Sequence, residues 1–118
     1  MPAAGQTVVT GTPGADVIVG ADAGETIDGR GGDDVICAGK GDDRVRGGPG
    51  DDRLFGGRGD DLLRGGSGRD RLFGGSGNDR MRTADGIADK IDCGRGRDDS
   101  ALIDTIDRQT RCERVRRT

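Results

Sequence analysis

Large apolar residues recur every nine residues through most of the chain, and an acidic residue stands two places before each of them. The apolar column consists of Ile18, Ile27, Ile36, Val45, Leu54, Leu63, Leu72 and Met81. The acidic column consists of Asp16, Glu25, Asp34, Asp43, Asp52, Asp61, Asp70 and Asp79. Eight tandem nonapeptides therefore run from Gly11 to Arg82. A period this short predicts one small unit stacked on copies of itself, which is a solenoid with an axial core.

The most regular nonapeptides, such as residues 47–55, have glycine at positions one, two and four, aspartate at position six and a large apolar residue at position eight. Glycine at these positions allows positive φ and a tight turn whose carbonyl groups point toward a common centre. The last three residues form a short strand whose middle side chain points inward. Two nonapeptides make one coil of 18 residues, so repeats n and n+2 stack as parallel strands about 4.8 Å apart.

This unit resembles the calcium-binding nonapeptide of the repeats-in-toxin (RTX), or hemolysin-type, family, and the resemblance extends over residues 11–82. It implies an all-β fold, a right-handed parallel β-roll built from two sheets of short strands. It also implies several calcium ions between stacked turns, held by position-six carboxylates and by carbonyl oxygens of the glycine loops. The expected ligand residues are Asp16, Gly32, Asp34, Gly41, Asp43, Gly48, Gly50, Asp52, Gly57, Gly59, Asp61, Gly66, Gly68, Asp70, Gly75, Gly77, Asp79 and Asp89.

The aspartates could instead be solvated turn formers, because Asp and Gly are common in turns. Stacked columns of carboxylates repel one another unless a cation lies between them, which favours the metal. A second acidic column at position five adds to this repulsion, and it consists of Asp33, Asp42, Asp51 and Asp60. Zinc is disfavoured because the chain has no histidine and its three cysteines are scattered. One apolar side chain per nonapeptide is a thin core, so we expect the chain to be disordered without calcium.

Both ends are expected to close the solenoid. Residues 1–10 form an N-terminal capping strand in which Val9 covers the first coil. Residues 83–118 hold degenerate repeats and a C-terminal cap, and one inserted residue after Arg82 brings Asp89 and Ile91 back into register. Beyond Ser100 we expect the repeat to dissolve. A short helix or irregular strand would then close the last coil with Leu102, Ile103 and Ile106.

Two of the three cysteines, Cys93 and Cys112, bracket the cap and are expected to form a disulfide worth about 3 kcal/mol. Cys37 lies at an outward position, where we interpret it as an unpaired, small apolar surface residue. A disulfide and calcium sites of modest affinity both suit an extracellular or cell-surface location. The cysteine-bearing end also resembles that of short secreted bacterial members of the family.

Position nine differs between the two sets of strands. Odd repeats have Val19, Cys37, Phe55 and Phe73 there, whereas even repeats have Asp28, Arg46, Arg64 and Arg82. The apolar face could contact a partner, a second copy of the chain or the folded-back tail, or the phenylalanines could simply shield the sheet. Arg44 and Arg80 strengthen the basic face, which suits a cell-surface polyanion, glycan or protein. Nucleic acid is disfavoured because the net charge is −3 and no aromatic residue lies near the arginines.

The composition excludes several function classes. Without histidine or tyrosine, and with few hydroxyl groups, the chain offers no nucleophile and base for an enzyme. No apolar run approaches the length of a membrane span. Two hypotheses remain: a secreted module that folds on binding calcium, and a binding or adhesive module that calcium makes rigid. Substitution of the outward residues, with the turns left intact, would separate them.

Overall fold

In the computed structural model, residues 7–20, 24–83, 89–94, 100–103, 108–110, 112 and 114–117 are described. These residues form thirteen β-strands and no helix. The strands are β1 (Thr7–Thr10), β2 (Val17–Val19), β3 (Glu25–Asp28), β4 (Val35–Cys37), β5 (Arg44–Arg46), β6 (Arg53–Phe55), β7 (Leu62–Arg64), β8 (Arg71–Phe73), β9 (Arg80–Arg82), β10 (Lys90–Asp92), β11 (Ser100–Ile103), β12 (Arg108–Thr110) and β13 (Arg114–Arg117).

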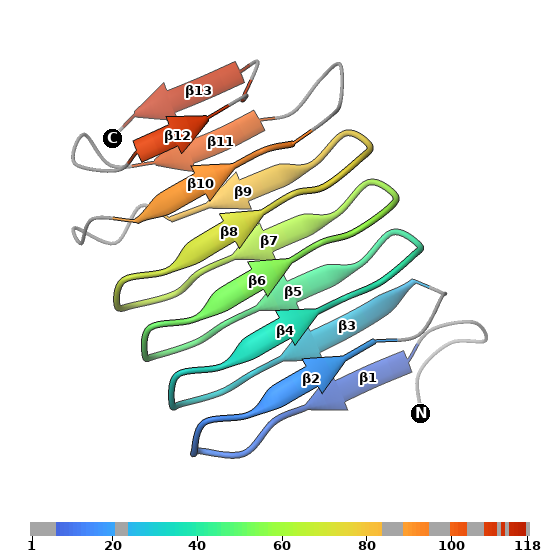
Figure 1. The fold of residues 1–118 in the computed structure, drawn as a ribbon, viewed down its shortest axis with the longest axis vertical. Helices are drawn as coiled ribbons and strands as arrows, with labels where there is room; N and C mark the ends of the chain where they lie inside the picture. Colours follow the sequence, from blue (N-terminus) through green and yellow to red (C-terminus); the bar gives the residue numbers. More distant parts are fainter. Residues whose placement is uncertain are drawn as a thin grey trace.

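Consecutive strands alternate between two parallel sheets, which lie one behind the other (Figure 1). The seven-stranded sheet has the order β1-β3-β5-β7-β9-β11-β13, and the six-stranded sheet has the order β12-β10-β8-β6-β4-β2. Each strand therefore pairs with the strand two elements later. Ile36 is the register partner of Leu54, and Val45 is the register partner of Leu63. The predicted stacking of repeat n on repeat n+2 is confirmed, and the protein is a β-solenoid.

The core is the column of position-eight side chains between the two sheets. Its members from Ile18 to Ile91 are at most 9% exposed, and most are fully buried. In the three-residue strands the middle side chain is buried while its neighbours are half-buried or exposed, as the strand geometry predicts. Each nonapeptide thus contributes one large side chain to the core, so burial of apolar surface is spread thinly along the stack.

At the N-terminal end, β1 pairs with β3 and extends the seven-stranded sheet. Val9 is half-buried and packs against the core. This is the covering role expected for it.

At the C-terminal end the expectation that the repeat dissolves beyond Ser100 is wrong. Residues 100–103 form the regular strand β11, which pairs in parallel with β9 and with β13. Strand β12 likewise extends the other sheet by pairing with β10. Ile103 is fully buried, and Leu102 lies in the same strand, whereas Ile106 lies outside the described residues. The parallel ladder and the buried Ile103 continue the coil beyond the regular nonapeptides.

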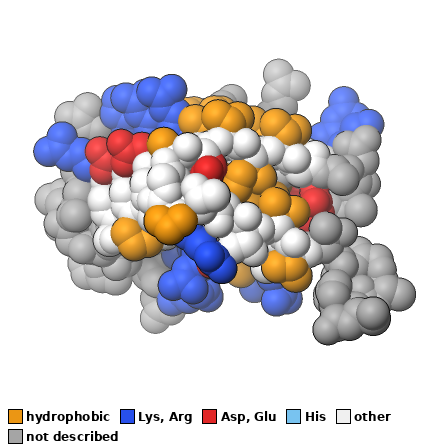
Figure 2. Space-filling model, turned by 90° about the horizontal axis from the view of Figure 1, so that it is seen from below, with side chains coloured by type: hydrophobic (Ala, Val, Ile, Leu, Met, Phe, Trp, Pro, Cys, Tyr) orange, Lys and Arg blue, Asp and Glu red, His pale blue; other side chains and the backbone are white. Residues whose placement is uncertain are grey.

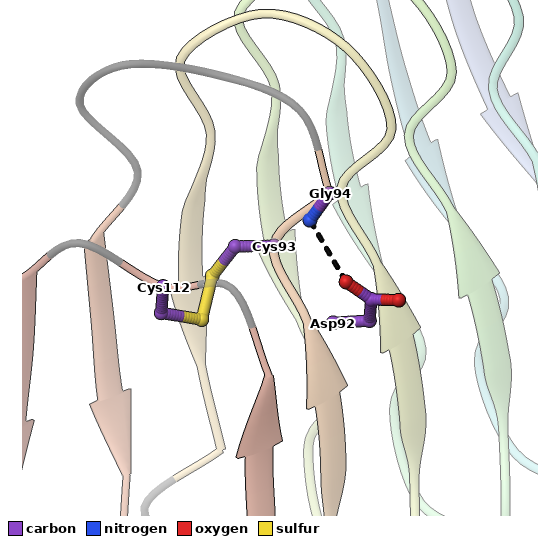
Figure 3. The surroundings of a disulfide bond; sticks show 4 residues. All are labelled: Asp92, Cys93, Gly94 and Cys112. Carbon is purple, nitrogen blue, oxygen red and sulfur yellow. Dashed lines mark hydrogen bonds between the residues drawn. A yellow bond between two sulfur atoms is a disulfide. The ribbon is translucent and has the colours of Figure 1, made fainter.

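Cys93 and Cys112 form a disulfide between two segments 19 residues apart, as expected (Figure 3). Beside it the backbone N–H of Gly94 donates a hydrogen bond of 2.9 Å to Oδ1 of Asp92. Cys37 is half-buried and is a free thiol. In the described part of the chain, no helix is long and apolar enough to cross a membrane.

Candidate metal centre

The position-six carboxylates form an inner ladder that connects successive coils on both sides of the stack. Oδ1 of each position-six aspartate from Asp34 to Asp79 accepts a hydrogen bond from the backbone N–H of the acidic residue 18 positions earlier. Asp34 donates to Asp52 over 2.8 Å, and Asp43 donates to Asp61 over 2.9 Å. The same contact joins Asp16 to Asp34, Glu25 to Asp43, Asp52 to Asp70, Asp61 to Asp79 and Asp70 to Asp89. The last contact spans 19 positions, which confirms that one inserted residue restores the register.

The second oxygen of these carboxylates, Oδ2, lies in a different environment from Oδ1. Oδ2 of Asp34, Asp43, Asp52 and Asp61 is buried and has no hydrogen-bond partner. These four residues are only 1–2% exposed, so water does not hydrate the charge freely. A buried carboxylate oxygen without a partner is costly, and a bound cation is one arrangement that removes the cost.

Backbone carbonyl oxygens lie beside these orphaned oxygens. A Cβ atom on Gly47 would lie 2.6 Å from Oδ2 of Asp52 and 2.7 Å from the carbonyl oxygen of Gly65, one coil further on. A Cβ atom on Gly56 would lie 2.6 Å from Oδ2 of Asp61 and 2.8 Å from the carbonyl oxygen of Gly74. Carboxylate and carbonyl oxygens therefore converge on the space that the missing side chain leaves open, and such hard oxygen donors suit calcium.

Only some positions of the glycine signature use the positive φ that glycine allows. Positive φ occurs at positions two and four, for example at 85° in Gly57 and 103° in Gly59, but not at Gly47 or Gly56. Glycine at position one is explained by the close approach of the two oxygens. Position-two and position-four glycines are explained by backbone conformation, since L-residues rarely adopt this region.

Every glycine expected as a ligand adopts positive φ. These residues are Gly32, Gly41, Gly48, Gly50, Gly57, Gly59, Gly66, Gly68, Gly75 and Gly77. Their carbonyl groups point along the stack, because a Cβ atom on Gly50 would meet the carbonyl oxygen of Gly32 in the coil before it. Gly39 and Gly94 have the same conformation but were not among the expected ligands. Gly39 follows Ala38, where the glycine pair of the motif is broken.

Burial raises the pKa of the inner carboxylates, and the charge of neighbouring acids adds to the effect. The pKa of Asp34 is raised, and those of Asp43, Asp52 and Asp61 reach about 6, about 7 and about 8. The backbone N–H that each Oδ1 accepts lowers the pKa but does not outweigh desolvation. In the metal-free stack these carboxylates are therefore not all ionised near neutral pH. A bound cation would stabilise their ionised form and lower their pKa values.

Asp16 differs from the other expected ligands. It is half-buried, and its Oδ2 accepts a 2.7 Å hydrogen bond from the backbone N–H of Thr12. The Thr12 hydroxyl contacts both carboxylate oxygens, at 2.9 and 3.1 Å. The chain itself satisfies this carboxylate at the N-terminal end of the ladder.

Glu25 is not among the expected ligands, but its carboxylate takes the place that the Oδ2 atom of an aspartate takes in other repeats. Glu25 is 5% exposed, and a Cβ atom on Gly20 would meet its Oε1 together with the carbonyl oxygen of Ala38. Its position in the acidic column was the only sequence signal that could have identified it.

The position-five acids form a separate outer ladder that runs in the opposite direction. The backbone N–H of Asp51 donates to Oδ1 of Asp33 over 2.7 Å, and that of Asp60 donates to Oδ1 of Asp42 over 2.8 Å. All four side chains are exposed. The position-five aspartates are therefore solvated turn residues, whereas the position-six carboxylates from Asp34 onward are buried.

Among the described residues, no group of three or more His, Cys, Asp or Glu side chains is placed to hold a metal. The additional oxygens beside each inner carboxylate come from the backbone. A family model described as the RTX calcium-binding nonapeptide repeat, in four copies, matches residues 10–45 and 46–81, which is more than half of the chain. Comparisons with curated proteins and with solved structures gave no match.

Proposed function

Because the chain belongs to the RTX calcium-binding nonapeptide repeat family, we propose that it is a secreted module whose β-roll folds as its stacked turns bind calcium. The observation that carries this proposal is the set of buried Oδ2 atoms that lack a hydrogen-bond partner at Asp34, Asp43, Asp52 and Asp61. The carbonyl oxygens of Gly65 and Gly74, which are position-one glycines, lie beside Oδ2 of Asp52 and Asp61 and add further hard donors to the set.

The proposed ligands follow the two sides of the stack. On one side, Asp34 acts with Asp52, and on the other, Asp43 acts with Asp61. The series continues with the pairs Asp52 and Asp70, and Asp61 and Asp79, together with the carbonyl groups of the position-two and position-four glycines. A bound divalent ion supplies positive charge that offsets the desolvation and mutual repulsion of these carboxylates. Asp16 is the weakest member, because Thr12 already satisfies its oxygens.

Coupling between metal binding and folding follows from the thin core and the buried charge. Each nonapeptide buries one large apolar side chain, while ordering each residue costs on the order of 1 kcal/mol of backbone entropy. The metal-free fold must also bury carboxylates whose pKa values, such as about 8 for Asp61, disfavour ionisation. Ligands that exist only in the coiled state make the free energy of calcium binding available for folding.

An extracellular location is part of this proposal. Sites of modest affinity fill where calcium is millimolar and stay empty in the cytosol. The disulfide between Cys93 and Cys112 suits an oxidising environment as well. The chain would then be disordered during export and rigid outside the cell.

The apolar position-nine face gives less support to self-association. Phe55 and Phe73 stack on each other with ring centroids 4.8 Å apart and planes 6° from parallel. Both are half-buried, which supports the interpretation that they shield the sheet. A binding role has more support on the opposite, basic sheet.

Far-ultraviolet circular dichroism during a calcium titration, started in excess chelator, tests the proposal. We expect a disordered spectrum without calcium and a cooperative gain of β signal on addition. Asp52→Asn keeps an acceptor oxygen for Asp34 but removes a charged ligand oxygen, so it should shift the calcium midpoint upward by about tenfold. Asp51→Asn, which alters the outer ladder, is the matched control and should leave the midpoint within about twofold. A strong β signal in chelator that calcium does not change would refute the coupling.

A further inference from the structure

Five exposed arginines gather on the outer side of the seven-stranded sheet, on strands β5, β7 and β9. We call this surface the basic face, and it consists of Arg44, Arg46, Arg64, Arg80 and Arg82. Seen from the N-terminal end of the stack, Lys and Arg side chains lie around the rim of the molecule (Figure 2). Their positions at the first and third places of three-residue strands direct them away from the core.

The parallel register arranges these arginines in rows across the strands. Arg46 is the register partner of Arg64, and Arg64 is the register partner of Arg82. A second row contains Arg44, the half-buried Leu62 and Arg80. Since neighbouring strands lie about 4.8 Å apart, the first row presents one guanidinium per strand on a rigid surface.

Like charges at adjacent ladder positions repel one another. One carboxylate lies at the end of the first row, because Asp28 on β3 is the register partner of Arg46, and its Oδ1 accepts a hydrogen bond from the backbone N–H of Arg30. Among the described strands, the register partners of Arg64, Arg80 and Arg82 include no acidic residue, so the repulsion along these positions lowers stability. An external ligand with regularly repeated anionic groups would offset this repulsion.

We propose that the basic face binds a sulfated polysaccharide. Guanidinium groups donate two parallel hydrogen bonds to oxyanions, which suits sulfate and carboxylate groups on an extended chain. The outward positions of β5, β7 and β9 hold only arginine and leucine, so they offer no ring on which bases could stack. A polysaccharide matches this surface better than a single-stranded nucleic acid does.

Polysaccharide binding by the basic face should depend on calcium, an inference that rests on the proposed function. The chain has a formal net charge of −3, which opposes a polyanion at long range. Binding of two calcium ions already makes the net charge positive. Since the rows exist only in the coiled state, attachment to the polysaccharide should require calcium.

Heparin is the probe for the test, with affinity measured by titration calorimetry in calcium at several salt concentrations. The face variant is Arg46→Gln/Arg64→Gln/Arg82→Gln. The control is Arg53→Gln/Arg71→Gln/Lys90→Gln, which removes the same charge from an exposed row on the opposite sheet. We expect the face variant to bind at least about tenfold more weakly and the slope of log K against log salt to fall by about three. The control should stay within about twofold of the wild type.

Equal losses in the two variants would overturn the proposal, because binding would then be a property of net charge and not of this face. Displacement of heparin by DNA at equal charge concentration would also overturn it, by assigning the surface to nucleic acid. Dichroism of each protein in calcium separates the two proposals. A folded wild-type chain that does not bind heparin contradicts only the basic face, whereas a chain that stays unfolded in calcium contradicts the proposed function.

Discussion

The side chain of Asp28 accepts a 3.0 Å hydrogen bond from the backbone N–H of Arg30, two residues later. Among the described residues, Arg30 is the only one other than glycine with positive φ, at 64°. It occupies position two of the third repeat, where the fourth to eighth repeats have glycine. The hydrogen bond to Asp28 helps to hold Arg30 in the left-handed conformation that the turn requires. Residues other than glycine rarely adopt this conformation.

Replacement of Arg30 by glycine should therefore stabilise the folded, calcium-bound chain. Removing the strain of the left-handed conformation should raise the free energy of unfolding by about 1–2 kcal/mol. The greater flexibility of glycine in the unfolded chain should lower it by about 0.5–1 kcal/mol. Lys40→Gly, at an exposed turn position with ordinary φ, removes the same charge and should instead lower stability. Thermal unfolding in calcium measures both. A fall in melting temperature for Arg30→Gly would contradict the strain argument.

Gly56→Ala should weaken calcium binding even though Gly56 does not need positive φ. The new methyl group would stand 2.6 Å from Oδ2 of Asp61 and 2.8 Å from the carbonyl oxygen of Gly74, so the oxygens must move apart. We expect a cost of about 1–3 kcal/mol, typical of overpacking. Because Ala38 occupies the same position in the fourth repeat, the coil should rearrange locally and remain folded.

The control for this variant is Gly14→Ala. A Cβ atom there would meet only the Thr12 hydroxyl, at 3.8 Å. Calorimetric titration should give a weaker apparent affinity for Gly56→Ala and an unchanged one for Gly14→Ala. Equal affinities for the two variants would show that the ion does not bind between Oδ2 of Asp61 and the carbonyl oxygen of Gly74.

The metal-free chain should become more stable as the pH falls. The folded-state pKa values of Asp43, Asp52 and Asp61 are raised from 3.8 to about 6, about 7 and about 8, so the folded form binds protons more tightly than the unfolded form. This contribution is lost as the pH rises from about 4 to about 8. Dichroism in chelator should show more β structure at the acidic end of this range. Protons should also compete with calcium, so its midpoint should rise as the pH falls.

Asp52→Asn/Asp61→Asn provides the control for the pH effect, since neither amide titrates. The variant should flatten the pH dependence of the metal-free β signal. A metal-free signal that increases with pH would contradict the assigned direction of the pKa shifts.

Removal of the disulfide should destabilise the C-terminal coils. Cys93→Ser/Cys112→Ser should lower the free energy of unfolding by about 3 kcal/mol, because the bond closes a loop with a sequence separation of 19 residues. Cys37→Ser is the matched control, since that thiol is free, and it should cost less than about 1 kcal/mol. Denaturant unfolding in calcium compares them. A reductant should lower wild-type stability to the level of the double variant and leave the variant unchanged.

Loss of the stacked phenylalanine pair should reduce stability more than it affects association. Phe55→Ser/Phe73→Ser removes two half-buried rings whose centroids lie 4.8 Å apart, and we expect a cost of about 1–2 kcal/mol per ring. Val19→Ser, at the same strand position but 75% exposed, should cost much less. Sedimentation should be the same for all three proteins. A smaller sedimentation coefficient for the phenylalanine variant would instead reveal association through this face.

The nine-residue period predicted the repeated part of the fold for two reasons. The direction of each side chain is set within its own strand, and the strands pair at a constant spacing of 18 residues. Alternation within a three-residue strand buries Leu54 and exposes Arg53, whatever the rest of the chain does. Constant spacing then pairs Leu54 with Ile36 and Leu72. Where the spacing changes, the same reasoning failed, and β11 continued a coil that was expected to end.

The sequence by itself determined the two-sheet coil, its inward column, the columns of acidic residues and the cysteine pair, since a fixed repeat leaves one way to stack equal units. Only the tertiary structure decided how each carboxylate uses its two oxygens. Oδ1 of Asp52 accepts a hydrogen bond from the backbone N–H of Asp34 in the preceding coil, whereas Oδ2 is buried beside the carbonyl oxygen of Gly65 in the following coil. Asp51, its neighbour in the chain, faces solvent. The reason is that burial and hydrogen bonding arise between coils, at contacts that no single nonapeptide contains.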